Sequence, residues 1–412
     1  MNNNLESALS LDAQIFLHDI EKADILVGIP SYNNVLTASY VLTQVVRGLD
    51  THFPNLKSVI FVSDGNSKDE TLTSVKRIHL PSEVKLIPAI YLGTSGKGTA
   101  VRAIFEAASS LNVRSVALVD SDLRSITPEW MRLLVTPTLR GTALVTPYYN
   151  RRKYDGTITN FLCYPVTASL FGKDIRQPIG GDFGLSIELV DDILESPLWD
   201  LDDVSCFGID IFETLTALAK GYKVKQALLG VKNHDAKDPS SQLASMFRQV
   251  MNTMFTCIEE YEPAWKNISG VASTEMFGEN NYEDTPEAIP VSLQTTTEAF
   301  KSGYDQYVPI YQSFLEEEIQ DKFNKIKNIE NTSVDLTSET WAKTVYSFIA
   351  EFHKKPKYGR EKLIDALRVL WFGRVAVFIK DTQDESREEA EERITEEAKI
   401  FQKLKPYLIE KY

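Results

Sequence analysis

The apolar positions of the first 125 residues fall into short continuous runs separated by longer amphipathic stretches. Each run has the length and composition of a strand that is buried on both faces. These runs are residues 24–30, 58–63, 84–87 and 116–119. The stretches between them, among them 36–49 and 99–111, have the spacing of helices, and 5–21 predicts a lead-in helix. Strands that alternate with helices predict a mostly parallel sheet with flanking helices, an α/β fold.

The pattern changes beyond residue 125. Apolar runs at 143–147 and 227–231 predict further strands, whereas residues 269–297 are acidic and rich in Thr, Asn and Pro. From residue 298 onward the spacing is helical, with an apolar stripe over 363–378 and a charge-dense helix over 385–408. We therefore expect three segments. They are an α/β domain at 1–268, an acidic linker at 269–297 and a helical C-terminal domain at 298–412.

Two carboxylates follow the fourth apolar run, in the sequence Asp120-Ser121-Asp122. Side chains two positions apart on an extended chain point to the same side, and the carboxyl ends of parallel strands face the ligand crevice of α/β sheets. Carboxylates this close repel each other unless a cation lies between them. The sequence therefore indicates a hard divalent ion, Mg²⁺ or Mn²⁺, with positions left for phosphate oxygens. An ordinary Asp-rich turn is the alternative for this stretch alone.

Other polar stretches are compatible with an anionic ligand. In Gly96-Lys97-Gly98, the glycines allow close approach of a phosphate, the following helix offers free N–H groups, and Lys97 adds a positive charge. The spacing is not that of a P-loop or a dinucleotide fingerprint, so the motif alone favours a surface turn, and its position one helix before the paired aspartates supports the phosphate interpretation. The basic, aromatic loop 148–159 is either an anion site or a solvated loop, and the turn at 178–184 is dense in glycine.

Two single residues have both a functional and a structural reading. Asp210 lies near a predicted helix start, where an aspartate is often only a cap. His234 follows the last predicted strand, and such a histidine is either structural or a metal ligand.

Composition narrows the class of protein. The net charge of −14 over 412 residues argues against a nucleic-acid partner, which needs clustered Lys and Arg. Three cysteines stand far apart and in no metal-ligand spacing, which favours a reducing compartment. The first residues lack the basic and apolar regions of a signal peptide, and no run approaches the roughly 18 apolar residues of a membrane span. We expect a cytoplasmic protein.

A set of motifs in a fixed order resembles the glycosyltransferases of the GT-A fold. More narrowly, the set is similar to the retaining enzymes that make glucosylglycerate, mannosylglycerate or glucosyl-3-phosphoglycerate. The motifs are IPSYNN at 29–34, SDGNSKDET at 63–71, GKG at 96–98, DSDL at 120–123, PIGGD at 178–182, GID at 208–210 and KNH at 232–234. The resemblance implies a Rossmann-like GT-A domain, and the helical C-terminal third is similar to the mannosylglycerate synthases.

The same resemblance implies roles for particular residues. Metal ligands would be Asp120, Asp122 and His234. Donor-binding residues would be Pro30, Tyr32, Asp64, Lys97 and Asp120. Acceptor-binding residues would be Arg151, Gly156, Thr157, Thr159 and Gly181. Asp182 and Asp210 would lie beside the transferred sugar or the acceptor hydroxyl as catalytic residues, although neither is an assured covalent nucleophile.

The implied reaction moves glucose or mannose from a GDP- or UDP-hexose to D-glycerate with retention, giving a compatible solute. The 3-phosphoglycerate enzymes tend to carry an acidic residue in the first loop and an arginine in the acceptor stretch. Here 31–34 and 156–159 have neither, which favours free glycerate, although Arg152 and Lys153 could hold a phosphate. A larger glycan or lipid acceptor, or a non-catalytic nucleotide-sugar-binding protein, is the alternative. A homodimer or higher homo-oligomer is expected.

Overall fold

The computed structural model describes residues 6–233, 242–279, 292–327, 329 and 334–412. The chain forms two compact units, each made of three segments. The α/β unit comprises Met1–Asn150, Gln177–Ala236 and Thr274–Pro286. The helical unit comprises Arg151–Arg176, Lys237–Ser273 and Glu287–Tyr412. The chain therefore enters the helical unit twice before its C-terminal helices, so the two units are interleaved rather than consecutive as the sequence predicted.

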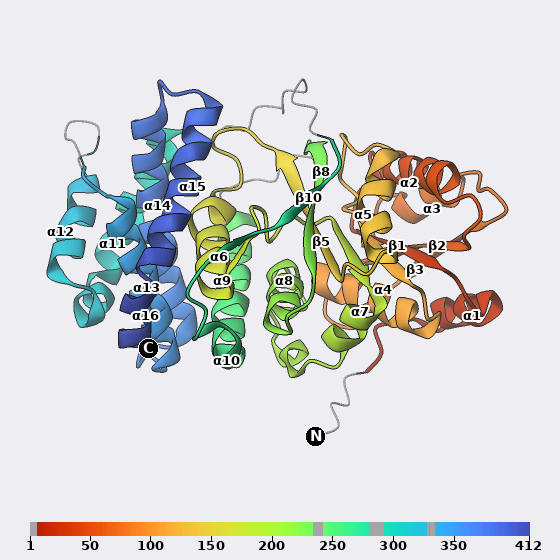
Figure 1. The fold of residues 1–412 in the computed structure, drawn as a ribbon, viewed down its shortest axis with the longest axis horizontal. Coiled ribbons are helices and arrows are strands. Elements are labelled where there is room, and N and C mark those ends of the chain that lie inside the picture. Colours follow the sequence, from red (N-terminus) through yellow and green to blue (C-terminus); the bar gives the residue numbers. More distant parts are fainter. Residues whose placement is uncertain (1–5, 234–241, 280–291, 328, 330–333) are drawn as a thin grey trace. The chain divides into compact units, whose positions relative to one another are not determined.

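An eight-stranded sheet forms the centre of the α/β unit, in the order β10-β8-β5-β7-β4-β1-β2-β3 (Figure 1). The strands are β1 (Ile25–Ser31), β2 (Ser58–Asp64), β3 (Val84–Ile90), β4 (Ser115–Leu118), β5 (Leu144–Asn150), β7 (Phe183–Ser186), β8 (Val224–Val231) and β10 (Glu275–Phe277). Strand β7 runs antiparallel to β4 and β5, and the other neighbouring pairs are parallel. The predicted mostly parallel sheet is confirmed.

Helices cover both faces of this sheet. Helices α2 (Ala38–His52) and α5 (Glu129–Leu139) pack on one face, and α4 (Lys97–Ser110), α7 (Ile187–Leu194) and α8 (Ile209–Ala219) pack on the other. Both faces of a strand in this sheet are therefore covered and need apolar side chains. In β1, Val27 and Ile29 pack in the core with residues of α2 and α5. Gly28 faces α4, where a Cβ would lie 2.4 Å from Ile104.

The lead-in helix is shorter than predicted. Helix α1 (Leu11–Ile20) begins only after Ser10, whose side chain caps it by accepting a hydrogen bond from the N–H of Ala13. Helix α3 (Thr71–Val75) and the 3₁₀ helix η2 (Pro197–Asp200) complete the unit.

Part of the predicted linker belongs to the sheet. Strand β10 pairs in parallel with β8, and Glu275 of β10 forms an ion pair with Lys225 of β8. A strand of three residues is too short to produce an alternating pattern that would stand out within a polar stretch. The linker prediction is therefore wrong for these residues.

The helical unit contains the predicted C-terminal helices and several earlier elements. The elements are η1 (Thr159–Cys163), α6 (Tyr164–Phe171), β6 (Lys173–Asp174), α9 (Gln242–Glu260), α10 (Glu262–Trp265), β9 (Ala272–Ser273), α11 (Leu293–Phe314), α12 (Glu317–Ile326), α13 (Ser338–His353), α14 (Arg360–Thr382), α15 (Arg387–Lys403) and α16 (Lys405–Lys411). The predicted apolar stripe is buried in α14. Ser386 and Glu389 form a capping box that begins α15. Among the described helices, none has the length and apolar character needed to span a bilayer.

Candidate functional site

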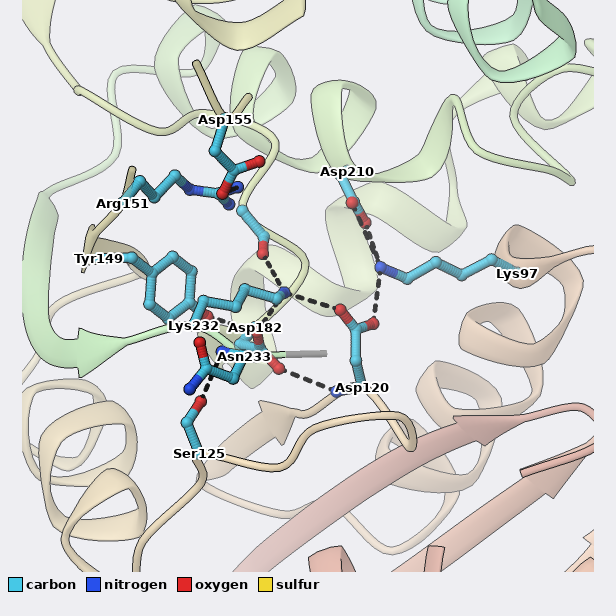
Figure 2. A network of polar contacts seen from close by, with 11 residues as sticks. Lys97, Asp120, Ser125, Tyr149, Arg151, Asp155, Asp182, Asp210, Lys232 and Asn233 are labelled. Carbon is cyan, nitrogen blue, oxygen red and sulfur yellow. Dashed lines mark hydrogen bonds and ion pairs between the residues drawn. The ribbon is translucent and has the colours of Figure 1, made fainter. Parts of the chain in front are cut away.

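Five charged side chains of the α/β unit meet where the central strands of the sheet end, and we call them the charged cluster (Figure 2). They are Lys97 at the start of α4, Asp120 after β4, Asp182 before β7, Asp210 in the first turn of α8 and Lys232 after β8. Because β7 is antiparallel to β4, its beginning lies at the same edge as the end of β4, where Phe183 pairs with Leu118. The topology therefore brings together residues that lie up to 135 positions apart, as the numbers of Lys97 and Lys232 show.

Asp120 lies at the centre of the charged cluster because each of its carboxylate oxygens contacts a different lysine. Its Oδ1 is 3.0 Å from the ammonium nitrogen of Lys97, and its Oδ2 is 2.9 Å from that of Lys232. Lys97 also lies 3.0 Å from Asp210. The sequence predicted three of these residues at one site, and the structure brings them into direct contact.

The charge of Lys97 is strongly favoured by its partners. Burial opposes the charge, but the carboxylates of Asp120 and Asp210 outweigh that effect and raise the pKa of the Lys97 ammonium well above its usual value. Lys97 therefore stays protonated at every physiological pH. It provides a fixed positive charge at the edge of the sheet.

Asp182 is fully buried and organises the cluster from within. Its carboxylate accepts hydrogen bonds from the backbone N–H of Asp120, 2.8 Å away, from the Tyr149 hydroxyl and from Lys232. Burial raises the pKa of the Asp182 carboxyl, and the charge of Asp120 adds to this effect, while Lys232 and the Tyr149 hydroxyl favour the ionised form. Both oxygens are thus used inside the protein and fix the backbone of Asp120. The catalytic role of Asp182 implied by the resemblance remains a prediction.

Asp210 does not have the capping role that its position suggested. Gly208 is the N-cap of α8, and no side chain caps this helix. The side chain of Asp210 instead pairs with Lys97 and keeps 15% of its surface exposed. Of the two predicted catalytic aspartates, Asp210 is therefore the one that can face a bound ligand.

Glu213 lies one turn after Asp210 on α8 and was not identified from the sequence. It is fully buried, and neither of its carboxylate oxygens has a hydrogen-bond partner. Burial and the charge of Asp210 raise the pKa of the Glu213 carboxyl well above its ordinary value of 4.5. Burial therefore favours the protonated form of Glu213 in the folded chain. The signal that could have found it is a single glutamate in the otherwise apolar stretch IDIFETLTALA.

In the parent, Glu213 should lower the free energy of unfolding as pH rises. Replacing Glu213 with Gln should remove this pH-dependent loss of stability. Above about pH 4.5, the unfolded chain releases the Glu213 proton while the folded chain keeps it, so the free energy of unfolding falls as pH rises toward the folded pKa. Glutamine has the same shape and no proton to release. We expect the stability of Glu213→Gln relative to the parent to rise by up to about 1.4 kcal/mol per pH unit between pH 5 and 7 in urea titrations. Glu188→Gln, at an exposed position of α7, is the control, and a pH-independent difference would contradict the prediction.

The Gly96-Lys97-Gly98 loop differs from its predicted role as a phosphate cradle. The N–H groups of Gly98 and Thr99 donate to the carbonyls of Cys206 and Ser205 at 3.0 Å. A Cβ on Gly98 would lie 1.8 Å from the Val204 carbonyl oxygen. Because Gly96 and Gly98 have no Cβ, the backbone of residues 204–206 can pack directly against them. The expectation of free N–H groups at the start of this helix is wrong for these two amides, because a tertiary contact occupies them.

The other predicted donor residues lie at or just after the ends of β1 and β2. Asp64 is fully buried and accepts hydrogen bonds from the Ser31 hydroxyl at 2.8 Å and from Ser67. Pro30 is the penultimate residue of β1, and Tyr32 follows this strand with 57% of its surface exposed. The three residues thus lie near the carboxyl ends of two neighbouring parallel strands. Their role in donor binding remains a prediction.

The loop after β1 is also tied to the turn that carries the two aspartates. The Thr37 hydroxyl donates to the Ser121 carbonyl at 2.8 Å, and the Ser121 hydroxyl donates to the Asn34 side chain at 2.7 Å. Ser121 is therefore fixed from both its backbone and its side chain.

The donor atoms of the charged cluster suit a hard divalent cation. Two ammonium groups pair with three carboxylates in the cluster, and Asp122, two residues after Asp120, is a further, largely buried carboxylate. Mg²⁺ and Mn²⁺ prefer oxygen ligands and often keep positions for water or phosphate oxygens. His234 lies outside the described residues, and within the described ones no three metal-ligating side chains form a group. The third ligand therefore remains a prediction.

Four of the predicted acceptor residues belong to the helical unit. Arg151 forms an ion pair with Asp155 at 3.1 Å, shown in Figure 2, and the Thr157 carbonyl accepts from Trp371 at 3.3 Å. Thr159 is buried and begins η1, and Gly156 precedes these two threonines. Residues 156–159 therefore pack within the helical unit.

Gly181, the fifth predicted acceptor residue, belongs to the α/β unit beside Asp120. Its φ of +88° favours glycine, and a Cβ at this position would lie 2.6 Å from Asp120 Oδ2. A side chain here would displace the central carboxylate of the cluster.

Lys153, which could have held an acceptor phosphate, has another role. Its ammonium donates to the carbonyls of Thr382, Gln383 and Glu385 at the end of α14. A cation at this position stabilises the C-terminal carbonyls of a helix. The structure therefore gives Lys153 a structural role in the helical unit.

Comparisons with known proteins identify similar solved structures. No family model matches the chain, and no curated protein sequence matches it. Glucosyl-3-phosphoglycerate synthase from Mycobacterium tuberculosis, in complex with Mn²⁺, UDP and phosphoglyceric acid, is 22% identical with a TM-score of 0.46, covering 61% of this chain and 84% of that chain. Its complex with Mn²⁺, UDP-glucose and phosphoglyceric acid is 21% identical with a TM-score of 0.46, covering 62% and 85%. Its complex with Mg²⁺ and UDP is 23% identical with a TM-score of 0.45, covering 58% and 83%. This synthase is one of the enzyme types that the sequence motifs resemble.

Proposed function

We propose that this chain is a metal-dependent, retaining hexosyltransferase that moves glucose or mannose from a nucleoside diphosphate sugar to D-glycerate. The observation that carries the proposal is the charged cluster, in which Lys97 lies between Asp120 and Asp210 at 3.0 Å from each. This arrangement places a fixed cation and a ligand-facing carboxylate at the edge where α/β sheets bind their ligands.

The residues of the cluster suit the charges that develop when the anomeric bond breaks. The leaving nucleoside diphosphate gains negative charge, which the Lys97 ammonium stabilises. The sugar gains positive charge, and Asp210 is the carboxylate placed to stabilise it. A divalent ion held by Asp120, Asp122 and His234 would add further positive charge at the diphosphate.

Free glycerate is the proposed acceptor rather than 3-phosphoglycerate. The stretch 156–159 has no arginine for a phosphate, and the Lys153 ammonium is bound to helix carbonyls. Arg151 is the proposed partner of the acceptor carboxylate because a guanidinium can bind a carboxylate through two parallel hydrogen bonds.

The test is a matrix of donors and acceptors with the purified chain. GDP- and UDP-linked glucose and mannose are each combined with D-glycerate and 3-phosphoglycerate, with Mg²⁺ or Mn²⁺, and products are separated by chromatography and their anomeric configuration read by NMR. We expect one donor to give a glycosylglycerate with the configuration of the donor. A clear preference for 3-phosphoglycerate would assign Arg152 to the phosphate, whereas donor binding without transfer to either acceptor would favour a non-catalytic nucleotide-sugar-binding protein.

Arg151→Lys should impair use of the acceptor and leave the donor unaffected. Lysine keeps the charge and loses the planar pair of donors, so the KM for glycerate should rise. We expect kcat/KM for glycerate to fall by tens of fold, which corresponds to about 2 kcal/mol for a charge-assisted bidentate contact.

Arg152→Lys is the matched control for this experiment, since it makes the same exchange at the next position. Steady-state kinetics with each substrate varied in turn separate the two sites. An effect on the KM of the donor alone would place Arg151 at the diphosphate.

A further inference from the structure

The stretch 156–159 leads directly into an uncommon type of helical turn. The N–H of Tyr164 donates to the carbonyl of Thr159, five residues earlier, so η1 is a single π-helical turn at the start of α6. Such turns occur mostly as single interruptions of α-helices and are frequent at functional sites. Thr159, a proposed acceptor-binding residue, is the first residue of this turn. The position of the acceptor residues therefore depends on the contacts that stabilise η1.

Two tryptophans of the C-terminal helices donate hydrogen bonds to this part of the chain. The indole N–H of Trp371, on α14, donates to the Thr157 carbonyl at 3.3 Å. The indole N–H of Trp341, on α13, donates to the Phe161 carbonyl at 2.8 Å. Both side chains are buried, with 1% and 0% of their surface exposed, and a buried indole N–H usually has a hydrogen-bond partner. The two indoles therefore bind the backbone on either side of Thr159.

Further contacts attach the same stretch to α14. The ring of Phe378 packs edge-on against Tyr154 and Phe161, with 6.2 Å and 5.0 Å between the ring centroids. The Lys153 ammonium donates to carbonyls at the end of the helix, at 2.7 Å and 2.8 Å. Helix α14 therefore contacts the residues before the acceptor stretch as well as η1.

We propose that Trp371 and Trp341 are positioning residues of the acceptor site, which keep η1 in the geometry that presents Thr157 and Thr159 to the acceptor. The inference rests on the proposed function for the acceptor residues. Each indole acts through a backbone carbonyl and does not need to touch the acceptor. Without one of these bonds, the turn can return to the more common register of four residues, which moves its side chains around the helix axis.

The test compares the full chain with Trp371→Phe and Trp341→Phe, which keep an aromatic ring and remove the indole N–H. The KM for D-glycerate at saturating donor should rise by about five-fold or more in each variant, within the range for one lost neutral hydrogen bond. The KM of the donor should stay within about twofold of the parent. A residue that only stabilised the fold would change the amount of active protein, and thus kcat, and leave KM unchanged. Hydrogen exchange of a peptide covering 157–165, read by mass spectrometry, should become faster in both variants.

Trp265→Phe is the matched control, because this indole is also buried in the helical unit and donates to the carbonyl of Ile258 at 2.7 Å, in a different segment. It should change neither KM nor the exchange of 157–165. If thermal unfolding shows that neither tryptophan variant folds, Lys153→Met replaces them with the same expected rise in KM. That variant removes an attachment of the stretch to α14, and methionine fills a similar volume.

A rise in the KM of the acceptor below about five-fold in both variants, an equal rise in Trp265→Phe, or unchanged hydrogen exchange would overturn the inference and leave the proposed transferase unaffected. If the parent prefers 3-phosphoglycerate, the same comparison of KM is made with that acceptor. Transfer to neither acceptor by the parent would overturn the proposed function and the inference with it. The activity of the parent therefore distinguishes the two failures.

Discussion

Replacement of Lys97 with methionine is expected to lower kcat by about 100- to 1000-fold, the usual range for removing one group that stabilises developing charge. Methionine preserves most of the length and packing of the side chain and removes the ammonium group. The leaving diphosphate then loses its fixed cation, and Asp120 and Asp210 lose the charge that separates them. We also expect a lower midpoint of thermal unfolding, because two carboxylates with restricted exposure are left with one counter-ion fewer.

The measurement is the rate of sugar transfer at saturating donor and acceptor, with folding checked by circular dichroism. Lys85→Met, on the exposed side of β3, is the control for the loss of one positive charge in the same unit. A kcat within about threefold of the parent would show that Lys97 does not act on the leaving group.

The parallel strands could be predicted from the sequence because a strand buried on both faces needs a continuous apolar run. Strand β1 satisfies this with Val27 and Ile29 on one face and Gly28 on the other. Strand β10 could not be predicted, since three residues give no period. The interleaving of the units depends on contacts between distant segments, such as Trp371 with Thr157 in the helical unit, and no local pattern encodes these.

The candidate site was predictable to the extent that its residues follow strands. Lys97, Asp120 and Asp210 each adjoin the edge of the sheet where strands end, so their convergence follows from the topology. Lys232 and Tyr149 were missed because their significance comes from Asp182, a buried carboxylate that they both contact. Lys232 stands in the KNH motif at 232–234, but the sequence does not show that its ammonium contacts Asp182. The glycines at 96 and 98 were misinterpreted because a backbone segment and a phosphate need the same space.

Asp122→Ala is expected to abolish transfer, with a loss of more than about 1000-fold, while leaving the fold intact. Asp122 is a proposed metal ligand, and the turn that carries it is also held by Ser121, through hydrogen bonds with Thr37 and Asn34. Without this carboxylate, the site loses one of its two adjacent oxygen ligands and with it the charge that a divalent ion requires.

Transfer is measured with added Mn²⁺ or Mg²⁺, and Mn²⁺ binding is measured in parallel in the presence of UDP. The parent should lose activity in EDTA and regain it with Mn²⁺, whereas the variant should bind Mn²⁺ weakly at every UDP concentration. Asp50→Ala, at the exposed end of α2, controls for the loss of one negative charge in the same unit. If Asp122→Ala kept its turnover and its full dependence on metal, the ligands would have to be sought elsewhere at this edge of the sheet.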